Sequence, residues 1–165
     1  MRGLLALFCG AAGAVTLSQF PEFSQQYLQR LGGQAEALAA VVAEFDASAA
    51  RAGLTRDGAL EELTGSAFLA AHQGDMRALI LRSDRASADY ALLRAAAPLE
   101  RLALPHRFRD AETLAATWDD FRPAVPVTPT GLTAAGIGFG AGWLGFWGLS
   151  GLILRPFRRQ RARNA

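Results

Sequence analysis

Two long uncharged runs lie at the ends of the chain, one over residues 3–17 and one over residues 125–154. Within the second run, residues 132–154 would form a helix of roughly 35 Å, enough to cross a hydrocarbon core of about 30 Å. A lone apolar segment crosses lipid as a helix because its backbone amides and carbonyls need partners there. The pattern therefore predicts two membrane helices, over residues 1–20 and 129–154.

The second predicted span has recognisable ends. Thr130 follows Pro129 and is suited to cap the helix. Arg155 and Pro156 are expected to close it, because neither a charged residue nor a proline favours its continuation through lipid.

The first span is open to two interpretations. Ala12-Gly13-Ala14 resembles the cleavage site of a signal peptide. The four-residue recurrence of small side chains in the same run favours a retained membrane helix instead. We predict retention, with an uncleaved signal anchor, and cleavage stays as the alternative.

Small residues recur every four positions in both spans. Such a face lets two membrane helices approach closely, so we expect the two spans to pack against each other. The alternative is that the glycines are merely tolerated in a membrane helix. The residues assigned to this contact are Ala6, Gly10, Ala14, Gly136, Gly138, Gly140 and Gly142.

Between the spans, apolar positions alternate in steps of three and four. The first series contains Leu31, Ala35, Leu38, Val42, Phe45 and Ala49, and the second contains Leu69, His72, Met76, Leu79, Ser83, Ala86, Tyr90, Leu93 and Ala97. This spacing predicts two long helices, over residues 22–50 and 67–103, that pack antiparallel along a coiled-coil-like seam. Gly32-Gly33 is expected to bend the first of them.

Two shorter helices complete the predicted middle region. Thr55 is suited to cap one that ends before Gly65, and Asp110 is suited to cap another. The apolar face of the latter is predicted to hold Leu114, Trp118 and Phe121.

The predicted fold class is therefore all-α, with two transmembrane helices flanking an extramembrane helical hairpin. The expected organisation is a membrane helix over 1–20, a helical domain over 21–128, a membrane helix over 129–154 and a basic tail over 155–165. Apolar residues make up 51% of the 165 positions and charged residues 19%, a composition that excludes a disordered chain.

Charge is distributed unevenly along the chain. Residues 18–128 hold 15 acidic residues against 11 arginines, a net charge of −4, so a nucleic-acid partner is not expected. The tail carries Arg155, Arg158, Arg159, Arg161 and Arg163 without an acid. By the positive-inside rule both termini are expected in the cytoplasm, the central domain in a bacterial periplasm, and the tail against membrane lipid.

The sequence contains no recognised catalytic pattern. His72 with Asp75, and His106 with Asp110, each offer two groups for a metal, whereas transition-metal sites use three or four. The lone Cys9 excludes an intramolecular disulfide. We expect no enzyme activity, no metal, no cofactor and no small-molecule substrate.

Two blocks carry a resemblance to a known family. They are SQFPEFSQQYLQRLGG at residues 18–33 and TWDDFRPAVPVTPTGL at residues 117–132. Together with the two spans, they resemble an uncharacterised family of proteobacterial membrane proteins, domain of unknown function family 2937. The resemblance implies an inner-membrane protein with two spans and a helical insert, and it implies no activity, substrate or catalytic residue.

Both blocks lie where the chain leaves the membrane, so we expect them to meet in a juxtamembrane collar. Alternatively, each block caps its own span. Arg30 is expected near Asp119 or Asp120. The collar residues are Phe20, Pro21, Phe23, Tyr27, Arg30, Trp118, Phe121 and Pro123.

The expected function is that of a non-enzymatic inner-membrane scaffold or accessory subunit, in contact with itself or another membrane protein. One alternative is a homo-oligomeric pore or envelope sensor. The absence of ionisable side chains inside the spans disfavours an ion pathway. The other alternative is a signal-cleaved, C-terminally anchored binding module.

Overall fold

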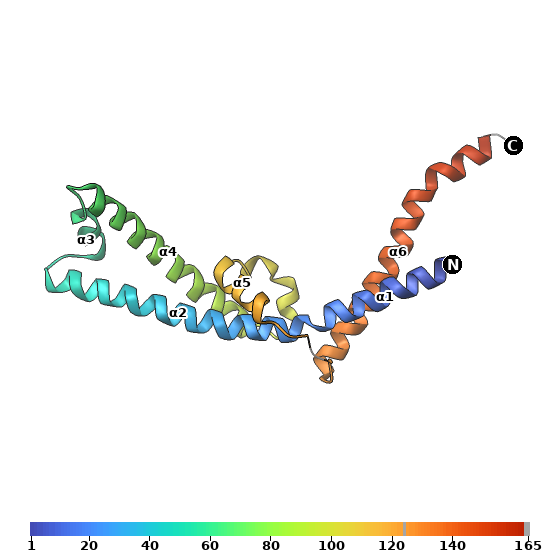
Figure 1. The fold of residues 1–165 in the computed structure, drawn as a ribbon, viewed down its shortest axis with the longest axis horizontal. Helices are drawn as coiled ribbons and strands as arrows, with labels where there is room; N and C mark the ends of the chain where they lie inside the picture. The colour runs from blue at the N-terminus through green and yellow to red at the C-terminus, as the bar shows by residue number, and fades with distance from the viewer. Residues whose placement is uncertain (124, 164–165) are drawn as a thin grey trace. The chain divides into compact units, whose positions relative to one another are not determined.

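The computed structural model describes the backbone of residues 1–123 and 125–163, and the side chains of that part as far as Gly151. All regular structure in these residues is helical, which confirms the all-α prediction (Figure 1). The elements are α1 (Arg2–Ser18), α2 (Phe20–Arg51), α3 (Arg56–Glu62), α4 (Ala67–Ala95), η1 (Glu100–Ala103), η2 (Pro105–Arg107), α5 (Ala111–Asp120) and α6 (Pro129–Arg163).

The chain forms two compact units. The first comprises Met1–Ser24 and Arg122–Ala165, and the second comprises Gln25–Phe121. The two predicted membrane segments thus fall in one unit. The predicted hairpin falls in the other, with its ends a few residues away from the expected boundaries.

Two stretches in the first unit are long and apolar enough to cross a membrane. Their mean hydropathies are 1.6 near the N-terminus and 1.2 over Pro129–Gly151. In the most apolar 18-residue part of each stretch, only 17% and 11% respectively is buried within the chain. A core helix of a water-soluble protein, by contrast, is mostly buried. The exposed surfaces of α1 and α6 are therefore apolar enough to contact lipid. The chain is a membrane protein.

The helix α6 begins at the predicted position 129, but its capping residue and its C-terminal end differ from the prediction. The helix begins at Pro129, and Thr128 caps it by accepting a hydrogen bond at 3.1 Å from the Gly131 amide. Proline suits the first helical position because its missing N–H would be unpaired there. The helix also continues through Pro156 to Arg163, since one proline removes a single backbone bond and is compatible with helix on either side.

The helices α2 and α4 of the second unit run in opposite directions and are joined through α3 (Figure 1). Their shared core contains Tyr27, Leu28, Leu31, Ala35, Leu38, Ala86 and Leu93. Most predicted seam positions of α2 are buried, and Phe45 is half-buried. In α4 the prediction is wrong at His72, which is exposed, and at Ala97, which lies beyond the helix.

The helix α4 ends at Ala95, eight residues before the predicted end at 103. Pro98 explains the difference, because a proline disfavours helical geometry in the residue before it. The side chain of Glu100 accepts a hydrogen bond at 2.8 Å from the Ala97 amide. The short turns η1 and η2 then bring Leu104 and Phe108 back against the core.

The predicted caps at Thr55 and Asp110 are confirmed. Thr55 accepts from the Gly58 amide at 3.1 Å, and Asp110 accepts from the Thr113 amide at 3.0 Å. The predicted face of α5 is confirmed at Leu114, which packs against the core, and is wrong at Trp118, which is 71% exposed; the buried residues of α5 are Thr113 and Thr117.

The two adjacent glycines of α2 have different surroundings. The helix is unbroken through both. A Cβ on Gly32 would lie 2.8 Å from Cε2 of Tyr90, whereas a Cβ on Gly33 would meet nothing within 4 Å. Gly32 therefore lets the Tyr90 ring of α4 lie against the α2 backbone.

We predict opposite effects for alanine at these two positions. Gly33→Ala should raise the free energy of unfolding by about 0.5–1 kcal/mol, because alanine favours the helix. Gly32→Ala should lose this gain and destabilise the hairpin by about 1 kcal/mol or more, because the Tyr90 ring has to move. Chemical denaturation of the full chain in detergent measures both, and an equal gain from the two variants would contradict the assigned packing.

Candidate functional site

The contact between α1 and α6 is made by glycine backbones. A Cβ on Gly138 would fall on the carbonyl oxygen of Gly13 and lie 2.8 Å from the Cβ of Leu17. A Cβ on Gly142 would fall on the carbonyl oxygen of Cys9 and lie 3.2 Å from the Cα of Gly10. The two helices approach this closely only because these positions carry no side chain.

The predicted packing residues divide between contact and open positions. Ala6, Gly10 and Gly138 are buried, and Ala14 and Gly142 are half-buried. A Cβ on Gly136 or Gly140 would meet nothing within 4 Å, so these two glycines lie away from the α1 contact.

Two residues of the contact between α1 and α6 were not predicted from the sequence. Gly13 faces Gly138, and Ala134 is fully buried. Both stand four residues from a contact position of their own helix, Gly13 from Cys9 and Ala134 from Gly138. The two overlapping glycine pairs of α6 have the same spacing, so spacing alone does not select the pair that meets α1.

The predicted collar residues are divided between the two units. Phe20, Pro21, Phe23 and Pro123 belong to the first, and Tyr27, Arg30, Trp118 and Phe121 belong to the second. Within the second unit, Arg30 forms an ion pair with Asp120. The Tyr27 ring packs on Phe108 at a centroid distance of 4.7 Å. The collar as a whole stays a prediction.

The remaining predicted site is the basic tail. Its five arginines lie in the last part of α6, and their side chains are outside the residues that the structure describes. Their contact with lipid therefore also stays a prediction.

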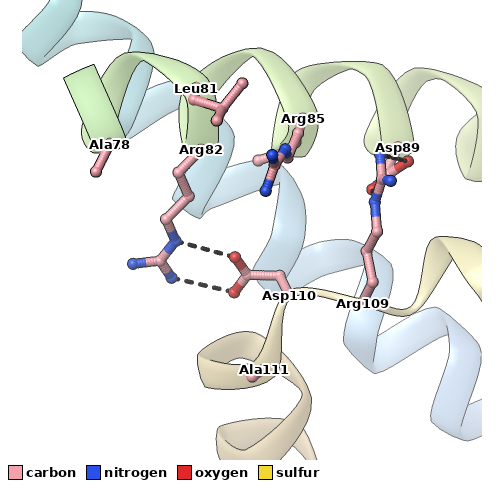
Figure 2. A pocket seen from close by; sticks show the side chains of 9 residues that line it. Ala78, Leu81, Arg82, Arg85, Asp89, Arg109, Asp110 and Ala111 are labelled. Atoms are coloured by element: carbon pink, nitrogen blue, oxygen red, sulfur yellow. Dashed lines mark hydrogen bonds and ion pairs between the residues drawn. The ribbon is translucent and has the colours of Figure 1, made fainter.

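An arginine-lined pocket of about 340 Å³ lies in the second unit, between α4 and the start of α5. Arg82, Arg85 and Asp89 line it from α4, at successive steps of three and four that place them on one face of the helix. Arg109 and Asp110 line it from the segment that leads into α5 (Figure 2).

Asp89 holds one side of this pocket together. Asp89 is only 3% exposed, and its carboxylate accepts hydrogen bonds from Arg109 Nε at 2.6 Å and from Arg107 Nη1 at 3.1 Å. Removing the partner of a buried charge costs about 3–5 kcal/mol. The two arginines therefore tie the segment before α5 to α4.

Asp110 holds the other side. It accepts two hydrogen bonds from Arg82, at 2.9 Å from Nε and 3.1 Å from Nη2, and it also caps α5 (Figure 2). The bonds from Arg82 lower the pKa of Asp110 to about 2. Arg82 also pairs with Glu112 at 2.6 Å, and these two carboxylates raise the pKa of Arg82.

Two further polar side chains are buried near the core. Arg101 is 5% exposed and donates to the Leu93 carbonyl at 2.9 Å and to Gln25 Oε1 at 3.1 Å. Burial lowers the pKa of Arg101 and raises the pKa of Tyr27 to about 12. Within the described residues, the Tyr27 hydroxyl has no hydrogen-bond partner.

The pocket was missed because its charges come from two separated stretches of sequence. One signal was available, namely the placement of Arg82, Arg85 and Asp89 on one face of a predicted helix. In the part of the chain that the structure describes, no three His, Cys, Asp or Glu residues come together as a metal site. His72 and His106 are both exposed.

The glycine contact predicts a position-dependent response to a large side chain. Gly138→Ile should lower the free energy of unfolding by about 1–3 kcal/mol, because the side chain meets backbone that has no room to move. Gly148→Ile is the matched control, because a Cβ there meets nothing within 4 Å, and it should change the free energy of unfolding by less than about 0.5 kcal/mol. Unfolding in mixed detergent micelles, followed by tryptophan fluorescence, measures both, and equal losses would contradict the assigned face.

The Asp110 ion pair predicts a stability change in acid. Because the pKa of Asp110 is about 2 in the folded chain instead of 3.8, the pair stabilises the fold above about pH 4 and is lost as the pH falls toward 2. Asp110→Asn retains a cap acceptor and should show a smaller loss over this range than the unmodified chain. Denaturation at stepped pH measures this, and an unchanged slope would contradict the pairing.

The chain was compared with known proteins. The family model for a protein of unknown function, DUF2937, matches residues 1–159. No curated protein and no solved structure matches the chain. Since the family model covers both membrane helices and the whole hairpin between them, this chain belongs to the DUF2937 family.

Proposed function

We propose that this protein is a non-enzymatic scaffold or accessory subunit of a bacterial inner membrane. The observation that carries the proposal is the backbone contact between α1 and α6 at Gly13 and Gly138. It joins the two ends of the chain into one membrane unit, and the hairpin unit is inserted between them in the sequence. Such a design suits a protein that holds a helical domain at a membrane.

The proposed topology has both termini in the cytoplasm. Five arginines follow the second span and only Arg2 precedes the first, so the positive-inside rule favours this orientation. The hairpin then lies in the periplasm. The alternative of an ion pathway is less favoured, because neither span carries an ionisable side chain in its interior.

The proposed contact surface for a partner is the face of α6 that contains Gly136 and Gly140. These glycines are not used by α1, and a second helix of this chain or of another membrane protein would approach closely there. Around this contact, large apolar side chains such as Leu144, which is 70% exposed, suit lipid.

A photoreactive side chain at Gly136 tests the scaffold proposal in intact cells. We expect a discrete protein adduct, either with a second copy or with another membrane protein. The matched control is Val15 of α1, which is 67% exposed and is expected to yield lipid adducts. Lipid adducts alone at both positions would overturn the scaffold role.

The same cells test the orientation. Thr64→Cys, in the exposed turn between α3 and α4, should react with a membrane-impermeant maleimide, while Cys9 should not. A fluorescent reporter that matures only in the cytoplasm should be bright when fused after Ala165. The reverse pattern would overturn the topology and leave the scaffold test unaffected.

A further inference from the structure

The pocket beside α4 contains more hydrogen-bond donors than its acidic residues use. A guanidinium carries five N–H donors. Arg82 uses Nε and Nη2 for Asp110 and Glu112, and Arg109 uses Nε and Nη2 for Asp89. No hydrogen bond from Nη1 of either arginine is present within the described residues. The free nitrogen of Arg82 points away from Asp110 and Arg85 (Figure 2), so only the unused donor of Arg109 is counted toward a ligand in the pocket.

Arg85 differs from its neighbours because it has no ion pair or hydrogen bond within the described part of the chain. It stands on α4 between Arg82 and Asp89, and its side chain projects toward the pocket (Figure 2). The Arg85 side chain is exposed, so its charge can reach a ligand that enters the pocket from solvent.

The charges around the pocket favour an anion. Three arginines and two aspartates line it, which leaves one formal positive charge. The net formal charge is still one positive when Arg107 and Glu112, which pair with the lining groups, are included. The excess is carried by Arg85, the residue without a partner.

The size and the donor arrangement indicate which anion. A volume of about 340 Å³ is at the lower end of the range of small-molecule pockets, about 300–1,000 Å³. It holds an oxyanion together with a small attached group. A carboxylate offers two oxygens, whereas a phosphate offers three or four and can accept from guanidiniums on two different elements.

We propose that this pocket binds a phosphate group, with Arg85 of α4 as its main ligand and with Arg109, from the segment before α5, completing the contact through its unused donor. The phosphate is carried by a small soluble ester or by a lipid headgroup, since both present the same oxygens. The ion pairs of Asp89 and Asp110 hold the two sides of the pocket in place for this ligand.

Isothermal titration of the full chain with inorganic phosphate tests the proposal. The protein is held in phosphatidylcholine nanodiscs, and sodium chloride keeps the ionic strength constant. We expect saturable binding that Arg85→Gln weakens about tenfold or more, because a charged hydrogen-bond partner is lost. Arg77→Gln is the matched control, since Arg77 stands on the same helix, is exposed and does not line the pocket.

Two organic phosphates then identify the source of the group. Tighter binding of glycerol phosphate than of dihexanoyl phosphatidic acid below its micellar concentration supports a soluble ester. The reverse order supports a lipid headgroup. Circular dichroism establishes that Arg85→Gln is folded. The proposal is overturned if none of the three phosphates binds, or if Arg85→Gln and Arg77→Gln bind them equally well.

Discussion

The two apolar helices touch backbone to backbone where Gly13 meets Gly138 and where Gly142 meets Cys9. In lipid there is little hydrophobic gain from bringing two apolar helices together, because the lipid tails are as apolar as the side chains. Association then depends on close van der Waals contact over a matching surface. The absence of a Cβ at these positions is therefore the condition for a stable pair, and the membrane unit depends on it.

The hairpin unit is held together by different forces. Its core is narrow and contains alanines beside a few large side chains such as Tyr27 and Leu93. The segment between α4 and α5 has little regular structure, and it is fixed to α4 by charge pairs at Asp89 and Asp110. The two carboxylates thus add to the apolar contacts that Leu104 and Phe108 of this segment make with the core.

The sequence predicts the parts of the fold that depend on local pattern. The seam of α2 follows from the spacing of Leu31, Leu38 and Val42, and the caps at Thr55 and Asp110 follow from residue type. On α5 the prediction is correct at Leu114, which packs against the core, and wrong at Trp118, which was expected to be buried because it is the largest apolar residue of this helix. Thr117, which satisfies its hydroxyl on the Thr113 carbonyl at 2.7 Å, is buried instead.

The candidate sites were less predictable for a physical reason. The glycine spacing in α6 is the same for the pair that meets α1 and for the pair that does not, so only the three-dimensional rotation of the helix distinguishes them. The pocket brings α4 together with residues that are 20 or more positions away along the chain. Neither arrangement is encoded in a local pattern of residues.

The pairing of α1 with α6 also has a consequence for biosynthesis. Gly13 leaves the ribosome long before Gly138, and at an elongation rate of about 5–20 residues per second the interval is on the order of ten seconds. During this time the face of α1 that contains Gly10 and Gly13 has no partner helix within its own chain. The nascent N-terminal helix must therefore persist in the bilayer as a solitary segment, or be sheltered by the insertion machinery, until translation is nearly complete.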